Sequence, residues 1–187
     1  MLTPTWLGRA GLRATAAGVA ACLLSGCGLL GGSTSPQQND PRVMTVTSPE
    51  FGQGVPIPSV YTCRGRSESP PLAWSGAPTN TRALAVVMDD VDTPISPYVY
   101  WIVFNISTQT PEIQAGRIPP GALQADSSKG TVGYAAPCPA QAHRYRFTVY
   151  ALNAPLRLRS GASLTAAWTA IASHAIGYGQ LVAEVTP

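Results

Sequence analysis

Residues 130–150 read GTVGYAAPCPAQAHRYRFTVY, and this stretch indicates the fold class. Glycine and proline recur through its first half, which predicts a loop. Its second half predicts a strand, in which successive side chains point to opposite faces. The two faces carry His143, Tyr145, Phe147 and Val149 on one side and Arg144, Arg146, Thr148 and Tyr150 on the other. A histidine and a tyrosine on one face beside a loop can donate hydrogen bonds to an anion, although a lone histidine at a strand start is more often structural.

Short apolar runs, broken by proline and glycine, predict the other strands. The predicted strands are residues 43–46, 83–88, 99–106, 145–152 and 181–185. Both alternating sets of residues 98–104 are apolar, which predicts a strand inside the sheet with both faces covered. These sets are Tyr98, Tyr100, Ile102 and Phe104 on one face and Val99, Trp101 and Val103 on the other.

One helix is predicted, from Leu164 to Ala175, with Ser163 as its N-cap and Gly177 as the residue that stops it. The chain is therefore expected to be mostly β with a single late helix.

The N-terminal residues 1–26 have the pattern of a secretory signal peptide. Arg9 and Arg13 precede an apolar run over residues 14–24, which is about half the roughly 20 residues that a membrane-spanning helix needs. Export followed by cleavage is therefore favoured over a permanent transmembrane anchor.

The signal ends in Leu24-Ser25-Gly26-Cys27, which resembles the bacterial lipobox. The resemblance implies that Cys27 becomes the first residue of the mature chain and carries acyl groups such as palmitate, whereas in ordinary secretion Cys27 would be incidental. Residues 28–41 are rich in Gly, Ser, Pro, Gln and Asn and predict a flexible linker after Cys27. We therefore expect a folded domain over residues 42–187, attached by lipid to the extracytoplasmic face of the cell membrane.

Charge argues against nucleic acid as a partner. The full chain has a formal charge of +3, and removal of Arg9 and Arg13 with the signal leaves +1 over 161 residues. Binding to a phosphate backbone requires a concentrated basic surface. The mature length suits one domain with its own core.

Two cysteines, Cys63 and Cys138, remain when Cys22 leaves with the signal and Cys27 carries lipid. Outside the cytoplasm such a pair more often forms a disulfide than binds metal or attacks a substrate. We expect a disulfide, with two free thiols as the alternative.

Three carboxylates follow the predicted strand 83–88, in the segment MDDVDTP of residues 88–94. A calcium loop is not indicated, because Pro94 stands where an EF-hand needs Asp or Asn, and the later Gly and Glu are missing. An Asp-rich turn is the simplest alternative to a functional role.

These segments together resemble the phosphatidylethanolamine-binding, or Raf kinase inhibitor-like, family. Residues 90–94 are similar to its Asp-Pro-Asp-Ala-Pro motif, and residues 130–145 are similar to its bacterial Gly-x-x-Gly-Tyr, Pro-Cys-Pro and His-Arg-Tyr motifs. Residues 61–63 and 69–74 also fit, and the resemblance extends from about Met44 to Val185. It implies a β-sandwich with a large central sheet and a small surface pocket for phosphate-like groups.

Carried onto this chain, the family's pocket would be lined by Asp90, Tyr100, Pro139 at the Cys138 corner, His143 and Tyr145. Tyr100 stands where the family commonly has a histidine. A tyrosine can donate a hydrogen bond but cannot become cationic near neutral pH.

Two functions follow as alternatives. The first is a membrane-tethered binding protein for a small anion or a phospholipid head group. The second is a protein-interaction or inhibitor module for an extracytoplasmic protein, without a small ligand. An enzyme is not expected, and neither a cofactor nor a metal is implied, because no nucleophile elbow, zinc motif or phosphate loop is present. The second histidine of the mature chain, His174, is expected to interact with the carbonyl end of the helix.

Overall fold

The computed structural model describes residues 44–94 and 98–187, which fall within the unit of residues 38–187. The predicted signal peptide, Cys27 and the linker lie outside the described residues, as does Val43 at the start of the first predicted strand.

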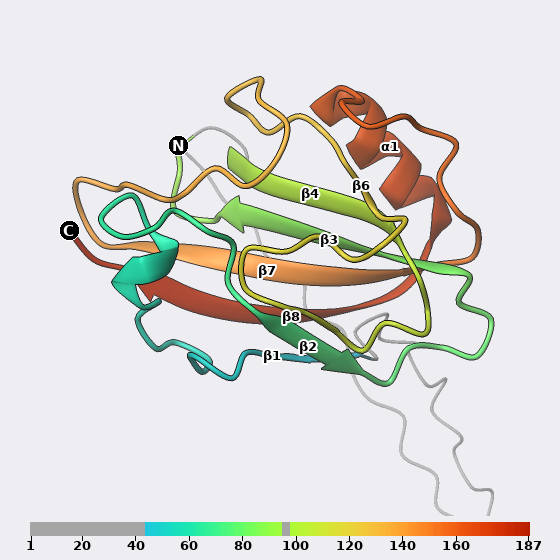
Figure 1. The fold of residues 1–187 in the computed structure, drawn as a ribbon, viewed down its shortest axis with the longest axis horizontal. Helices are drawn as coiled ribbons and strands as arrows, with labels where there is room; N and C mark the ends of the chain where they lie inside the picture. Colours follow the sequence, from blue (N-terminus) through green and yellow to red (C-terminus); the bar gives the residue numbers. More distant parts are fainter. Residues whose placement is uncertain (1–43, 95–97) are drawn as a thin grey trace, which may run out of the picture. The chain divides into compact units, whose positions relative to one another are not determined.

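The described residues form two antiparallel sheets and one α-helix (Figure 1). The elements are β1 (Thr45–Thr47), the 3-10 turn η1 (Ser59–Tyr61), β2 (Leu72–Ser75), β3 (Ala83–Asp90), β4 (Tyr98–Ile106), β5 (Glu112–Ile113), β6 (Leu123–Gln124), β7 (His143–Leu152), α1 (Leu164–His174) and β8 (Ala175–Val185). The larger sheet has the order β6-β4-β3-β7-β8, and the smaller one has the order β1-β2-β5. The prediction of a mostly β fold with one late helix is confirmed.

The large sheet is covered on both faces. One face packs against the small sheet through a core that includes Trp74, Trp101 and Phe147. The other face packs against α1, whose Ala167 and Ile171 are buried. Figure 1 shows α1 and the strands β1 and β2 on opposite sides of the five strands. All eight residues of β3 are consequently buried.

Strand β4 lies inside the large sheet, between β3 and β6, as its apolar pattern predicted. The predicted division of its residues between two faces is wrong at Val99 and Tyr100, because Val99 packs in the core under α1 and Tyr100 packs against the core that contains Trp101. Met88 pairs with Trp101 and the next residue, Asp89, pairs with Val99, so Tyr100 is the extra residue of a β-bulge. The bulge turns Tyr100 toward the core that contains Trp101, while Ile102 and Phe104 pack in the core under α1.

The edge strand β8 is protected by the segment that begins at Met44. Met44 donates its N–H to Tyr178 O at 3.1 Å, and Ile57 donates to Glu184 O at 2.7 Å. This cover occupies the edge that could otherwise pair with another chain. A Cβ at Gly179 would lie 2.4 Å from Met44 O, so the close approach requires glycine there.

Helix α1 begins as predicted, because Ser163 Oγ accepts the N–H of Ala166 at 3.3 Å. The prediction that Gly177 stops it is wrong. Ala175 is already extended, with φ −67° and ψ 127°, and opens β8, in which Gly177 pairs with Ala151. The chain thus passes from helix to strand without a left-handed residue. In the part of the chain that the structure describes, no helix is long and apolar enough to cross a bilayer.

Candidate anion-binding site

Asp90 and His143 form the centre of the candidate site. Asp90 ends β3, is 1 % exposed, and lies opposite Tyr145 on β7. Its Oδ2 is 2.7 Å from His143 Nδ1, and its Oδ1 accepts the N–H of Asp92 at 2.9 Å. A carboxylate can only accept, so Nδ1 donates and Nε2 is left for another partner. Because the His143 side chain is 31 % exposed, Asp90 fixes an imidazole that solvent can reach.

The other two aspartates pair with neighbouring cations of β7. Arg146 donates to Asp89 at 2.6 Å, and the backbone N–H of Arg144 donates to Asp92 at 2.7 Å. Burial raises the pKa of Asp89, and this effect exceeds the opposing effect of Arg146. Hydrogen bonds from Arg144 lower the pKa of Asp92 to about 2. The three carboxylates are therefore separate cross-strand partners of β7 and do not merely form a turn.

The Tyr145 hydroxyl is the unusual group of the site. The residue is fully buried, and Tyr145 Oη has no hydrogen bond of normal geometry to the residues described, although the side chains of Tyr100 and Asp90 lie near it. Burial raises the pKa of Tyr145 well above its ordinary value, and the nearby Tyr100 and Asp90 raise it further. The phenol stays protonated at neutral pH and keeps a donor for a ligand.

Tyr100 reaches the site because of its bulge. Its ring meets the Tyr145 ring edge-on, with centroids 5.2 Å apart and an interplanar angle of 85°, and lies 5.1 Å from the Tyr98 ring. Its carbonyl accepts the N–H of Ala135 at 3.0 Å, which ties the bulge to the loop before β7. Partial burial raises the pKa of Tyr100, so this phenol is also a neutral donor.

Pro139 lies beside a corner that connects two distant segments. The structure pairs Cys63 with Cys138, with Cα atoms 5.4 Å apart, and Cys63 also donates its N–H to Pro137 O at 3.1 Å. Pro139, the next residue, is half-buried. The structure thus brings Asp90, Tyr100, His143 and Tyr145 together and places Pro139 at the corner of the adjoining loop.

One charged residue near the site was not singled out from the sequence. Lys129 Nζ lies 5.8 Å from the centroid of the Tyr100 ring, within the range of a cation–π contact. The signal that could have identified it is its rarity, because Lys129 is the only lysine in the sequence.

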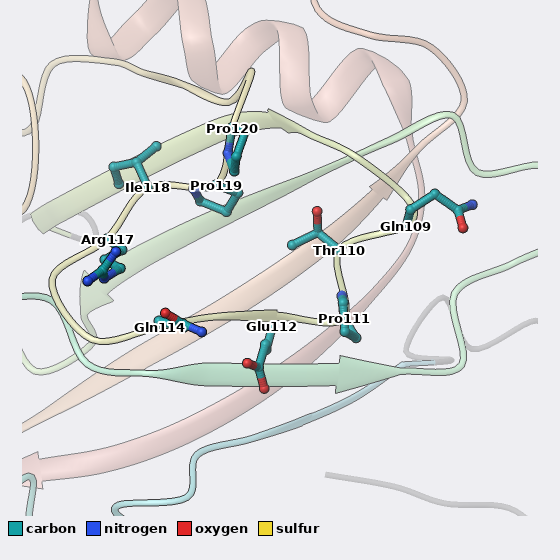
Figure 2. A pocket seen from close by; sticks show the side chains of 9 residues that line it. All are labelled: Gln109, Thr110, Pro111, Glu112, Gln114, Arg117, Ile118, Pro119 and Pro120. Carbon is teal, nitrogen blue, oxygen red and sulfur yellow. The ribbon is translucent and has the colours of Figure 1, made fainter.

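A separate concavity of about 490 Å³ lies along the segment after β4 (Figure 2). It is lined by Gln109, Thr110, Pro111, Glu112, Gln114, Arg117, Ile118, Pro119 and Pro120. None of the predicted site residues is in this lining, so the pocket is distinct from the site at Asp90.

Comparison with known proteins identifies the family and the fold of the chain. The phosphatidylethanolamine-binding protein family model matches residues 47–186. A UPF0098 protein of Methanothermobacter thermautotrophicus is 38% identical over 145 residues, covering 74% of this chain and 96% of that protein. A candidate lipoprotein, LppC, of Mycobacterium tuberculosis is 40% identical over 142 residues, covering 74% of this chain and 70% of its own length.

Two solved structures have the same fold. A candidate phosphatidylethanolamine-binding protein homologue, CT736, of Chlamydia trachomatis aligns with a TM-score of 0.72 at 32% identity, covering 78% of this chain and 99% of its own. YbcL of E. coli, titled a new member of the mammalian PEBP family, aligns with a TM-score of 0.73 at 26% identity and the same coverage. The matched part makes up almost all of each of those two chains. The chain therefore belongs to the phosphatidylethanolamine-binding protein family.

Proposed function

We propose that this domain binds a small anion, such as phosphate or a phospholipid head group, at the site formed by Asp90, Tyr100, His143 and Tyr145. The observation that carries the proposal is the buried, unpartnered hydroxyl of Tyr145. Buried polar groups nearly always have a hydrogen-bond partner, and an unsatisfied one costs about 1–3 kcal/mol. A bound anion would accept from this hydroxyl and remove that cost.

The neighbouring groups support the same chemistry. Tyr100 adds a second phenol, and burial keeps its proton in place. His143 Nε2 faces away from the bond with Asp90, and a protonated ring donates there while its charge balances the carboxylate. Pro139 is proposed to complete the wall of the site. We propose binding rather than turnover, because within the described residues the hydrogen-bond partner of His143 is a carboxylate and not a hydroxyl or thiol.

We further propose that the domain acts at the extracytoplasmic face of the membrane, attached through acylated Cys27. The name of the M. tuberculosis relative supports a lipoprotein. Each buried acyl CH₂ contributes about 0.8 kcal/mol to membrane attachment, and two chains give stable anchoring where one does not. Labelling of the expressed full chain with a palmitate analogue tests this part: the label should be lost in a Cys27→Ser variant, and a label that persists in the variant would contradict it.

The binding proposal is tested by NMR of the two imidazoles. Residues 38–187 are titrated with inorganic phosphate and with phosphoethanolamine, and a His143→Ala variant assigns the signals. His143 should shift and saturate, while His174, whose Nδ1 is 2.9 Å from Asn153 Oδ1 near the end of α1, should not move. The absence of a His143 shift at millimolar ligand would contradict the proposal. The protein-interaction alternative would then take first place, with capture of an extracytoplasmic protein unaffected by His143→Ala as its test.

A further inference from the structure

Among the described residues near the site, one cation, Lys129, forms no ion pair with a carboxylate. Arg144 is engaged by Asp92 and Arg146 by Asp89, so neither guanidinium is free to serve a ligand. Lys129 is exposed, and it has no ion pair among residues 44–94 and 98–187. Its ammonium instead lies over the face of the Tyr100 ring.

The turn that holds Lys129 is fixed to the strand of the site. The backbone N–H groups of Ser127 and Lys129 donate to Thr131 O and to Ser127 Oγ, at 2.9 and 3.2 Å. Ser128 donates its N–H to Val99 O at 2.8 Å, and Val99 returns a hydrogen bond to Ser128 Oγ at 2.9 Å. Because Val99 directly precedes Tyr100, these bonds set the position of Lys129 relative to the phenol.

The balance of charge at the site depends on this residue. Asp90 contributes one negative charge, and a protonated His143 can do no more than cancel it. Tyr100 and Tyr145 are neutral donors, which favour an anion over an uncharged acceptor less strongly than a cation does. Lys129 therefore adds the positive charge that brings the site to neutrality with a neutral His143 and to +1 with a protonated His143.

We infer that Lys129 is an anion-binding residue of this site and selects a charged ligand over a neutral one. The inference rests on the proposed function. When an anion binds to the two phenols, the flexible lysine stem lets the ammonium turn from the Tyr100 ring to the ligand, and all three of its N–H donors can serve. The ligand class is then a phosphate group with an oxygen exposed toward the turn at residues 127–131.

Three variants of residues 38–187 separate this role from general charge. Lys129→Met removes the charge and keeps the length, and Lys129→Arg keeps the charge. Arg82→Met is the matched control, because it removes one positive charge at the start of β3, the end opposite Asp90. Phosphate affinity, followed through the His143 ring, should fall about tenfold or more in Lys129→Met, as expected for a lost charge-assisted hydrogen bond. It should stay within about threefold of the unmodified domain in Lys129→Arg and Arg82→Met.

The single lysine allows a second, direct readout. Reductive ¹³C-methylation keeps the charge and labels Lys129 and the terminal amine, and the Lys129→Met spectrum identifies the lysine signal. Phosphate should shift that signal with the same midpoint as His143.

The possible failures are distinguishable. If phosphate saturates His143 but binds Lys129→Met as tightly as the unmodified domain, the role of Lys129 is overturned while the proposed function stands. If Arg82→Met weakens binding as much as Lys129→Met, the effect is one of net charge and the role is again overturned. If His143 does not respond in the unmodified domain, the proposed function and the role of Lys129 fall together.

Discussion

At the scale of single residues, the buried Tyr145 hydroxyl is expected to lower stability and, under the proposed function, to favour binding. A buried donor without a partner destabilises the fold, and the structure keeps it beside a fixed imidazole and a second phenol. Removal of this hydroxyl is therefore expected to leave stability unchanged or higher and to lower the affinity for an anion.

Tyr145→Phe tests that expectation. The free energy of unfolding should stay unchanged or rise by up to about 1 kcal/mol, because no protein hydrogen bond is lost, while phosphate affinity should fall. Tyr134→Phe is the matched control: Tyr134 Oη donates to Tyr61 O at 2.7 Å, so its loss should cost about 1 kcal/mol. Urea unfolding measures the free energy of unfolding of both variants. If Tyr145→Phe lost more free energy of unfolding than Tyr134→Phe, the Tyr145 hydroxyl would have a hydrogen-bond partner in the free protein, and the expectation would be wrong.

The ion pair of Asp92 with Arg144 predicts a pH effect. The pKa of Asp92 is lowered to about 2 by hydrogen bonds from Arg144. The folded pKa lies below the unfolded value of about 3.9, so the stabilisation is present above that value and is lost as pH falls from about 4 to about 2. Asp92→Asn should therefore flatten the decline of the urea midpoint between pH 5 and pH 2.5. Arg144→Gln should flatten this decline as well. If the decline were unchanged in both variants, the ion pair of Asp92 with Arg144 would not be its cause.

At the scale of elements, the strands and the helix were predictable, whereas the local departures from regularity were not. Apolar runs identified β3, β4 and β7, and Ser163 identified the start of α1. The bulge at Tyr100 depends on how β4 pairs with β3, so a count of alternating residues assigned it to the wrong face. The end of α1 likewise depends on the entry into β8 and not on Gly177.

The candidate site was also predictable only in part. Its members Asp90, His143 and Tyr145 were identified from their motifs, and the structure brings them together. Their partners could not be read from the sequence, because the pairing of Asp89 with Arg146 depends on the register of β3 against β7. Lys129 was missed because it comes from a turn that only the folded chain places over Tyr100.

The cover on the edge strand β8 is tested by Gly179→Ala. The added Cβ would meet Met44 O at 2.4 Å, so the N-terminal segment must move away from β8. We expect a loss of about 1–3 kcal/mol in the free energy of unfolding, as for other overpacked sites, with faster hydrogen exchange at Met44 and Gly54. Gly52→Ala is the control, since its Cβ would make an ordinary 3.6 Å contact with Val55. If Gly179→Ala and Gly52→Ala lost the same free energy of unfolding, the N-terminal segment along β8 would not stabilise the fold through its close approach to Gly179.

At the scale of the whole molecule, the two sheets and α1 leave the site at one end of β3 and β7, where the loop before β7 adjoins it. This loop is held by the pairing of Cys63 with Cys138, which are 75 residues apart. The segment around η1 and the loop before β7 are thereby fixed to each other, so loss of the disulfide should affect both stability and the site.

Mass spectrometry with alkylation before and after reduction tests the disulfide, and only the reduced protein should gain two alkyl groups. Closing a loop of this length stabilises by about 4 kcal/mol in the chain-entropy estimate, so the reduced domain should unfold at clearly lower urea concentration. Two alkylatable thiols in the unreduced protein would contradict the pairing.

The central claim is that an anion satisfies the buried hydroxyl of Tyr145. The most direct measurement is a crystal structure of residues 38–187 with and without inorganic phosphate. We expect a phosphate oxygen within hydrogen-bond distance of Tyr145 Oη, with His143 Nε2 as a second donor and Asp90 still bound to Nδ1 of His143. A saturating phosphate found elsewhere, with Tyr145 Oη still unpartnered, would contradict it.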